Sequence, residues 1–182
     1  MKKKYELLKD DTIKVNDKTL YRIRTLKDFG YVKAGDIGGY IEKEENLSHE
    51  GNCWVSGNAE VYGNARVYGD ARVYGNARVY GNAEVSGNAE VYGNARVYGD
   101  AYISSDNDYA LVQCFGSMNR TTTFFRLKDS KDIGVKCGCF YGTLEEFREK
   151  VKETHNSSPI ADEYLILADL IQKRFDRLLS EN

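Results

Sequence analysis

The sequence contains few of the residues that several common protein classes require. Only two of its 182 residues are histidine, and four are cysteine. Two histidines cannot form a three-histidine zinc site. No apolar run is as long as a membrane span, and the basic N-terminus lacks the apolar segment of a signal peptide. We therefore expect a cytoplasmic protein whose cysteines are reduced thiols.

The chain also lacks a large excess of charge of either sign. Its formal net charge is −2. This value argues against general nucleic-acid binding, because affinity for phosphates depends on clustered lysine and arginine side chains. A chain of this length is long enough to bury a core, in one elongated domain or two small ones.

What the sequence does contain is a six-residue repeat of the form Val-X-Gly-Asn-Ala-X, with Asp in place of Asn in some units. Such periods are sought before helices and strands are assigned, because a missed repeat leads to the wrong fold. The apolar position is occupied by Val55, Val61, Val67, Val73, Val79, Val85, Val91, Val97 and Ile103. The small position four residues after each valine is occupied by Ala59, Ala65, Ala71, Ala77, Ala83, Ala89, Ala95 and Ala101.

The repeat predicts short strands separated by tight turns. Because side chains alternate across a strand, each valine points inward while its two neighbours point outward. Gly-Asn and Gly-Asp accept positive φ and turn the chain, and alanine fits the corner. Three units then form a triangular coil, so residues about 18 positions apart stack on one another. The alternative is an antiparallel meander, whose strands of three or four residues would be too short to pair well.

The repeat resembles that of the hexapeptide-repeat proteins, which form left-handed parallel β-helices and often trimerise. Residues 35–41 (GDIGGYI), 46–55 (NLSHEGNCWV) and 138–143 (GCFYGT) narrow the resemblance. They look like a group of phage and prophage proteins of Gram-positive bacteria with Gly-Asn-Ala-X-Val-Tyr repeats and this C-terminal module. The resemblance covers nearly the whole chain and implies a phage origin, with the bacterial cytoplasm as location. It carries no activity that transfers to this chain.

We accordingly predict a mainly β protein with three parts. Residues 1–48 form an N-terminal β cap and an irregular first coil, residues 49–108 form a left-handed parallel β-helix of about three coils, and residues 109–182 form an α+β module. Within the cap we expect strands at 5–8, 12–15 and 19–23, and the irregular coil at 31–48. Within the module we expect strands at 109–115, 121–128 and 133–140 and two helices, the first opened by a capping box at Thr143 and the second running from Pro159 to about 179.

Stacking at intervals of 18 residues predicts the outer surfaces of the β-helix. One face carries an unbroken row of tyrosines next to two arginines: Tyr62, Tyr80 and Tyr98 with Arg78 and Arg96. This row has three interpretations. It is a solvated ladder that stiffens the stack, a surface for a trimer or dimer, or a site for a small ligand or nucleotide, because tyrosine stacks on bases and arginine binds phosphate.

The remaining candidates for chemistry are weaker. Hexapeptide-class acyltransferases rely on a histidine, which makes His49 a weak catalytic candidate, although a packed cap residue is the simpler interpretation. His155 falls at a helix end, where a cation suits the dipole. Cys137 and Cys139 look like core residues of a strand, and we predict no metal site and no cofactor. A polar hairpin contributes weak anion-binding candidates, which are Arg120, Thr121, Thr122 and Arg126.

Three functional hypotheses follow, and the sequence does not choose sharply between the first two. The first is a non-enzymatic phage or prophage binding protein, which as an anti-defence factor would capture a host protein or a signalling nucleotide between subunits. The second is a structural or assembly module whose β-helix is a spacer. The third is an acyltransferase that uses His49. We expect a homo-oligomer and no interaction with membranes.

Overall fold

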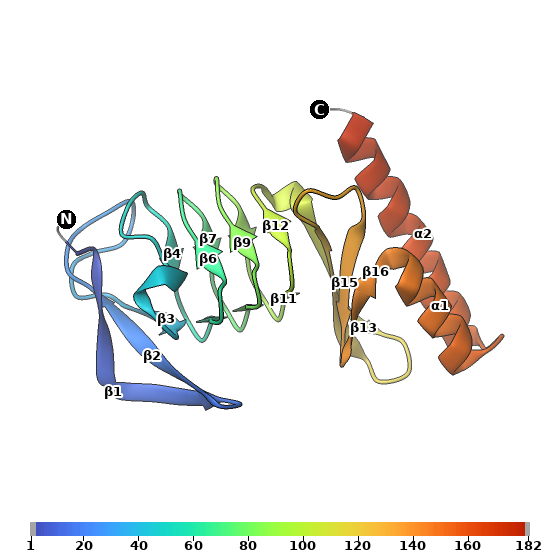
Figure 1. Cartoon of the computed structure of the whole chain (residues 1–182), viewed down its shortest axis with the longest axis horizontal. Coiled ribbons are helices and arrows are strands. Elements are labelled where there is room, and N and C mark those ends of the chain that lie inside the picture. Colours follow the sequence, from blue (N-terminus) through green and yellow to red (C-terminus); the bar gives the residue numbers. More distant parts are fainter. Residues whose placement is uncertain (1–2, 181–182) are drawn as a thin grey trace. The chain divides into compact units, whose positions relative to one another are not determined.

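The computed structural model describes residues 3–180 and shows a mainly β protein (Figure 1). The chain divides into two compact units, one ending at Asp106 and the other beginning at Asn107. The first unit holds an N-terminal hairpin and a parallel β-solenoid, and the second holds an antiparallel sheet and two helices. None of the helices in the described part of the chain is long and apolar enough to span a membrane.

The repeats form three walls of parallel two-residue strands. The first wall contains β4 (Trp54–Val55), β7 (Arg72–Val73) and β10 (Glu90–Val91). The second wall contains β5 (Glu60–Val61), β8 (Arg78–Val79) and β11 (Arg96–Val97). The third wall contains β6 (Arg66–Val67), β9 (Glu84–Val85) and β12 (Tyr102–Ile103). Partners lie 18 positions apart, as in Val61 with Val79, which confirms the predicted register.

The core of the solenoid consists of the inward valines and corner alanines. The nine apolar residues of the repeat, from Val55 to Ile103, are at most 1% exposed. Backbone bonds join consecutive coils, for example from Tyr62 N to Val79 O at 3.1 Å. Gly75 shows why glycine opens each turn: its φ is +73°, and a Cβ would lie 3.1 Å from the nitrogen of Gly93 in the next coil.

The stack starts before residue 49, in the region where the sequence predicted an irregular first coil at 31–48. On the second wall β3 (Ile37–Ile41) pairs in parallel with β5, which makes four rungs there. Leu47, just after the short 3₁₀ helix η1 (Glu44–Asn46), forms a parallel bridge with Val67. That bridge joins residues 20 positions apart, whereas later partners are 18 apart. The first coil therefore contains two extra residues, and they fall at His49 and Glu50.

A long hairpin extends the second wall at its N-terminal edge (Figure 1). It consists of β1 (Tyr5–Val15) and β2 (Lys18–Thr25), and β2 pairs antiparallel with β3. The sequence predicted two separate strands at 5–8 and 12–15. They form one strand, because an irregularity between Leu8 and Thr12 interrupts the register without ending the pairing.

The C-terminal unit is a four-stranded antiparallel sheet with two helices. Its strands are β13 (Tyr109–Phe115), β14 (Arg120–Arg126), β15 (Ile133–Cys137) and β16 (Phe140–Thr143), and a 3₁₀ turn, η2 (Asp106–Asp108), precedes them. The helices are α1 (Leu144–His155) and α2 (Pro159–Ser180). The predicted third strand at 133–140 was wrong, because Gly138 has a φ of +57° and turns the chain between β15 and β16. Cys139 is therefore an exposed turn residue and not a core residue of a strand.

The helices pack on the sheet as their sequences predict. The Thr143 hydroxyl accepts a bond from Glu146 N, and the Glu146 carboxylate accepts one from Thr143 N, which confirms the capping box. A common core contains Phe124, Ile133, Val135, Leu144, Phe147, Val151, Ala161, Tyr164, Leu167, Ala168, Ile171 and Phe175.

Candidate functional site

The three tyrosines of the second wall form a stacked row. The ring centroids of Tyr62 and Tyr80 lie 5.0 Å apart with an interplanar angle of 12°, and those of Tyr80 and Tyr98 lie 4.6 Å apart at 34°. Beside the row, Arg78 makes an ion pair of 3.1 Å with Glu60, one coil earlier. The structure therefore brings together the residues that the repeat predicted to share one surface.

The N-terminal hairpin covers one end of this row. Leu20 from β2 is fully buried and packs with Tyr40 and Tyr62, while Ile13 and Val15 from β1 also contact this cluster. Tyr62 is only 8% exposed. Burial raises the pKa of its hydroxyl to about 12. Tyr62 is thus a core residue beneath the hairpin rather than part of an open surface.

The other end of the row remains accessible. Tyr80 and Tyr98 are partly exposed, and Arg96 is exposed. The surface available to a partner is therefore smaller than the predicted one, since it lacks Tyr62, and consists of Tyr80, Tyr98, Arg78 and Arg96. The sequence analysis did not predict that the hairpin covers Tyr62, because it treated the strands before residue 24 as a cap on the end of the stack. Instead, the hairpin continues the sheet of the second wall and folds over its outer face.

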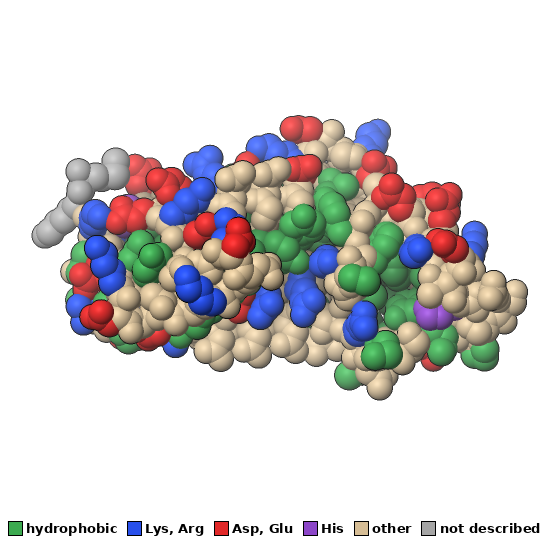
Figure 2. Space-filling view, turned by 60° about the horizontal axis from the view of Figure 1, so that its bottom comes forward, with side chains coloured by type: hydrophobic (Ala, Val, Ile, Leu, Met, Phe, Trp, Pro, Cys, Tyr) green, Lys and Arg blue, Asp and Glu red, His purple; other side chains and the backbone are tan. Residues whose placement is uncertain are grey.

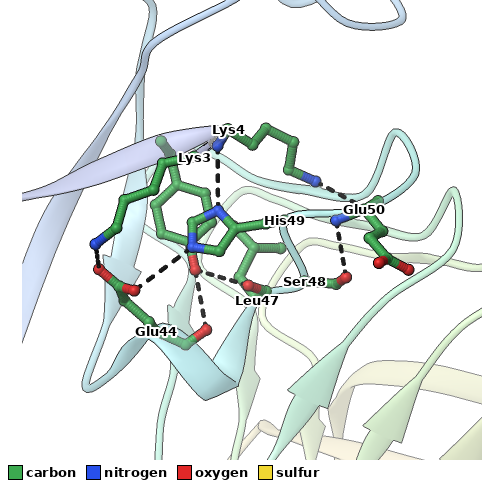
Figure 3. A network of polar contacts seen from close by, with 8 residues as sticks. Lys3, Lys4, Glu44, Leu47, Ser48, His49 and Glu50 are labelled. Atoms are coloured by element: carbon green, nitrogen blue, oxygen red, sulfur yellow. Dashed lines mark hydrogen bonds and ion pairs between the residues drawn. The ribbon is translucent and has the colours of Figure 1, made fainter. Parts of the chain in front are cut away.

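His49 lies in the two-residue insertion of the first coil (Figure 3). Its Nδ1 accepts a hydrogen bond from Lys4 N at 3.2 Å, its ring stacks on Tyr5 at 4.3 Å, and its Nε2 is 3.6 Å from a carboxylate oxygen of Glu44. The same carboxylate binds Lys3. These contacts hold the first strand of the hairpin against the first coil. They account for His49 as a packing residue of the cap.

Lys4 is a structural residue that the sequence did not reveal. Its side chain is buried, and its ammonium group donates to Cys53 O at 2.9 Å and to the carbonyls of Glu50 and Gly51 at 3.4 Å. Burial lowers the pKa of Lys4 below its usual value. The ammonium group thus satisfies backbone carbonyls of the first coil that have no earlier coil to pair with.

The four anion-binding candidates of the polar hairpin do not form one site. Arg126 makes an ion pair of 3.0 Å with Asp108. Thr122 is buried, and its hydroxyl donates to the sulfur of Cys137 at 3.1 Å. Thr121 lies on the face of β14 opposite to that of Thr122, because consecutive side chains of a strand alternate between its two faces. Arg120 alone lines a pocket.

That pocket lies within the C-terminal unit and has a volume of about 350 Å³. It is bounded by the β13–β14 loop, the β15–β16 turn, α1 and the first turns of α2. Apolar side chains line it together with a few polar groups: Ser117, Met118, Arg120, Cys137, Cys139, Phe140, Phe147, Lys150, Val151, Thr154, His155 and Tyr164. Figure 2 shows apolar side chains exposed beside lysine and arginine side chains on this unit. The lining residues come from four separate segments of the chain, so no single sequence motif predicts the pocket.

All four cysteines are free, with Cys53 buried and Cys114 and Cys139 exposed. Within residues 3–180, no three or more His, Cys, Asp and Glu side chains are grouped so as to hold a metal ion.

Comparison with known families bears on the repeats. Residues 59–75, 71–87 and 89–105 match a family model described as the YdcK beta solenoid repeat. The chain is a β-solenoid repeat protein. The match covers the solenoid only, so it says nothing about the hairpin or the C-terminal unit. No curated protein matches this β-solenoid protein.

Proposed function

We propose that this protein is a structural module, in which the solenoid acts as a rigid spacer in a larger assembly. The observation that carries the proposal is the continuity of the stack. Every inward position from Val55 to Ile103 is filled by a buried apolar residue, and the corners are filled by alanine. Such a core leaves no room for a substrate, whereas each coil pairs with its neighbours and stiffens them.

Two features of the N-terminal side support the same reading. Lys4 satisfies backbone carbonyls of the first coil, and His49 joins the hairpin to that coil. The hairpin then covers Tyr62 on the second wall. A terminal cap is what a repeat stack requires to remain soluble and to avoid pairing at its exposed strand edges.

Duplicating one coil tests this proposal. A second copy of residues 73–90, inserted after Glu90, keeps every valine in phase and lengthens the stack by about 4.8 Å. We expect this variant to fold with a melting temperature at least equal to that of the parent, because stability in such stacks is nearly additive. The matched control inserts only half a coil, which places turns over strands and lowers stability. A spacer role is refuted if the full-coil variant unfolds like the half-coil variant.

A second candidate function is capture of a host protein or a signalling nucleotide, as an anti-defence factor of a phage or prophage. It is favoured by the accessible end of the tyrosine row, where Tyr98 and Arg96 offer a ring and a guanidinium group. Calorimetry with nucleotides, and light scattering for a dimer or trimer, would distinguish the two functions. Saturable binding that Arg96→Gln abolishes would favour capture. Self-association alone would favour the structural role.

The acyltransferase hypothesis has less support. It requires His49 to act as a base, but Nδ1 of His49 already accepts a hydrogen bond from the backbone and its ring is stacked on Tyr5. If acyl transfer were detected, an unchanged rate in His49→Ala would eliminate this hypothesis.

A further inference from the structure

The pocket of the C-terminal unit has an aromatic floor. The rings of Phe147 and Tyr164 meet edge to face, with centroids 5.6 Å apart and an interplanar angle of 90°. Phe140 packs against Phe147 at 5.5 Å, and His155 stacks on Tyr164 at 5.8 Å. Edge-to-face packing of this kind fixes ring positions, and such a surface accepts another ring at low cost. The floor therefore suits the apolar, ring-bearing part of a ligand.

The Lys and Arg side chains that line the pocket give it a positive charge. Arg120 and Lys150 line the pocket, and no aspartate or glutamate is among its lining residues. Lys150 also pairs at 2.8 Å with Glu153, which neutralises part of its charge. Arg120 is thus the principal charge at the opening, and a guanidinium group favours a carboxylate or phosphate through two parallel hydrogen bonds.

Two glycines give the pocket its shape. A Cβ on Gly138 would lie 2.3 Å from Nη1 of Arg120, so the guanidinium group rests directly on the β15–β16 turn. A Cβ on Gly116 would lie 1.9 Å from the hydroxyl of Tyr164. Both glycines have positive φ, at +57° and +71°. Any side chain at either place would displace Arg120 or Tyr164, so the two glycines allow both groups to approach the backbone closely.

We propose that this pocket binds a small aromatic anion, with its ring on Phe147 and Tyr164 and its carboxylate or phosphate on Arg120. A volume of about 350 Å³ is at the lower end of the range for small-molecule sites. It corresponds to about a dozen water molecules at roughly 30 Å³ each, which is enough for a ligand of one ring and one anionic group. The proposal is independent of the structural role of the solenoid.

Binding is tested with three probes of similar size on the full-length protein. Phenylacetate and phenyl phosphate represent the two kinds of anion, and phenylacetamide is the neutral counterpart. Calorimetry should show saturable binding of at least one anion, at least tenfold tighter than the amide. Arg120→Gln should weaken that binding by tenfold or more, Arg120→Lys should retain part of it, and the control Lys131→Gln, on an exposed loop outside the pocket, should leave it unchanged.

Thiol labelling provides a readout that does not depend on a variant. Both Cys139 and Cys114 are exposed, but only Cys139 lines the pocket. The bound anion should slow alkylation of Cys139 by iodoacetamide several-fold and leave Cys114 unaffected. The proposal is overturned if neither anion binds saturably, if the amide binds as tightly as the anions, if Arg120→Gln binds like the parent, or if both thiols are protected to the same extent.

Discussion

The ring of Tyr62 stacks on that of Tyr80, with ring centroids 5.0 Å apart, yet the two tyrosines have different surroundings, because only Tyr62 is buried beneath the hairpin. One row of outward side chains is therefore core at one end and surface at the other. The hairpin packs on the part of the second wall around Tyr62. Farther along, around Tyr80 and Tyr98, the outer face of the same wall is accessible. This division determines which substitutions should affect stability and which should affect assembly.

The hairpin should contribute strongly to stability through Leu20. This side chain is fully buried against Tyr40 and Tyr62. Leu20→Ala is expected to lower the free energy of unfolding by about 2–5 kcal/mol, the usual cost of a cavity in a core. Leu26→Ala is the matched control, since Leu26 is 46% exposed, and should cost much less. Equal effects in urea unfolding would show that the hairpin does not pack on the wall.

High pH should destabilise the solenoid unit through Tyr62 and Tyr74. Burial raises the pKa of Tyr62 to about 12 in the folded protein, and partial burial together with the hydrogen bond to the Glu90 carboxylate raises that of Tyr74 to about 12, from an ordinary value near 10. The unfolded chain loses these protons first, so stability is complete below about pH 10 and falls as the pH rises toward 12. Tyrosinate absorbance should show late-titrating groups, and Tyr62→Phe should remove part of the alkaline loss. A titration in which every tyrosine behaves normally would contradict this.

The ammonium group of Lys4 should be more important than that of its neighbour Lys3. Lys4→Met removes the donor for the carbonyls of Cys53, Glu50 and Gly51 and is expected to destabilise the protein by about 1–3 kcal/mol. Lys3→Met removes only a surface ion pair with Glu44, which is worth about 0–1 kcal/mol. Thermal melts of the two variants make the comparison. If Lys4→Met melts no lower than Lys3→Met, the capping role is wrong.

Two ion pairs with the same spacing should differ in energy. Arg78 pairs with Glu60, whose side chain is 10% exposed, whereas Arg72 pairs with Glu90, whose side chain is 33% exposed. Arg78→Met leaves a buried carboxylate without its partner, at a cost of about 3 kcal/mol. Arg72→Met should cost at most about 1 kcal/mol. Chemical denaturation of both variants decides the point, and a reversed order would refute the burial argument.

The solenoid was predictable because its contacts join equivalent positions of a repeat with a constant period. Val61 and Val79 occupy the same phase, so a period of 18 residues places them on one wall without further information. The capping box at Thr143 is likewise contained in four consecutive residues. Both features follow from spacing and residue type alone.

The rest depends on contacts between segments that share no period. Nothing in the spacing of Leu20 indicates that it covers Tyr62, and Lys4 meets Cys53 across 49 positions. The turn at Gly138 was missed because a single glycine within an alternating run also fits a continuous strand. Arg120 and Tyr164 reach one pocket only after the sheet and helices have folded.

Cross-linking of stacked corners tests the central claim of a solenoid of 18-residue coils most directly. The amides of Asn58 and Asn76, 18 positions apart, lie 3.4 Å from each other on adjacent coils. A variant with cysteine at both positions should form a disulfide under mild oxidation, since stacked parallel strands fall within the range that such a bond requires. The control pair Asn58→Cys with Asn82→Cys is out of phase and should remain reduced. Efficient cross-linking of the out-of-phase pair, with none in the stacked pair, would contradict the account.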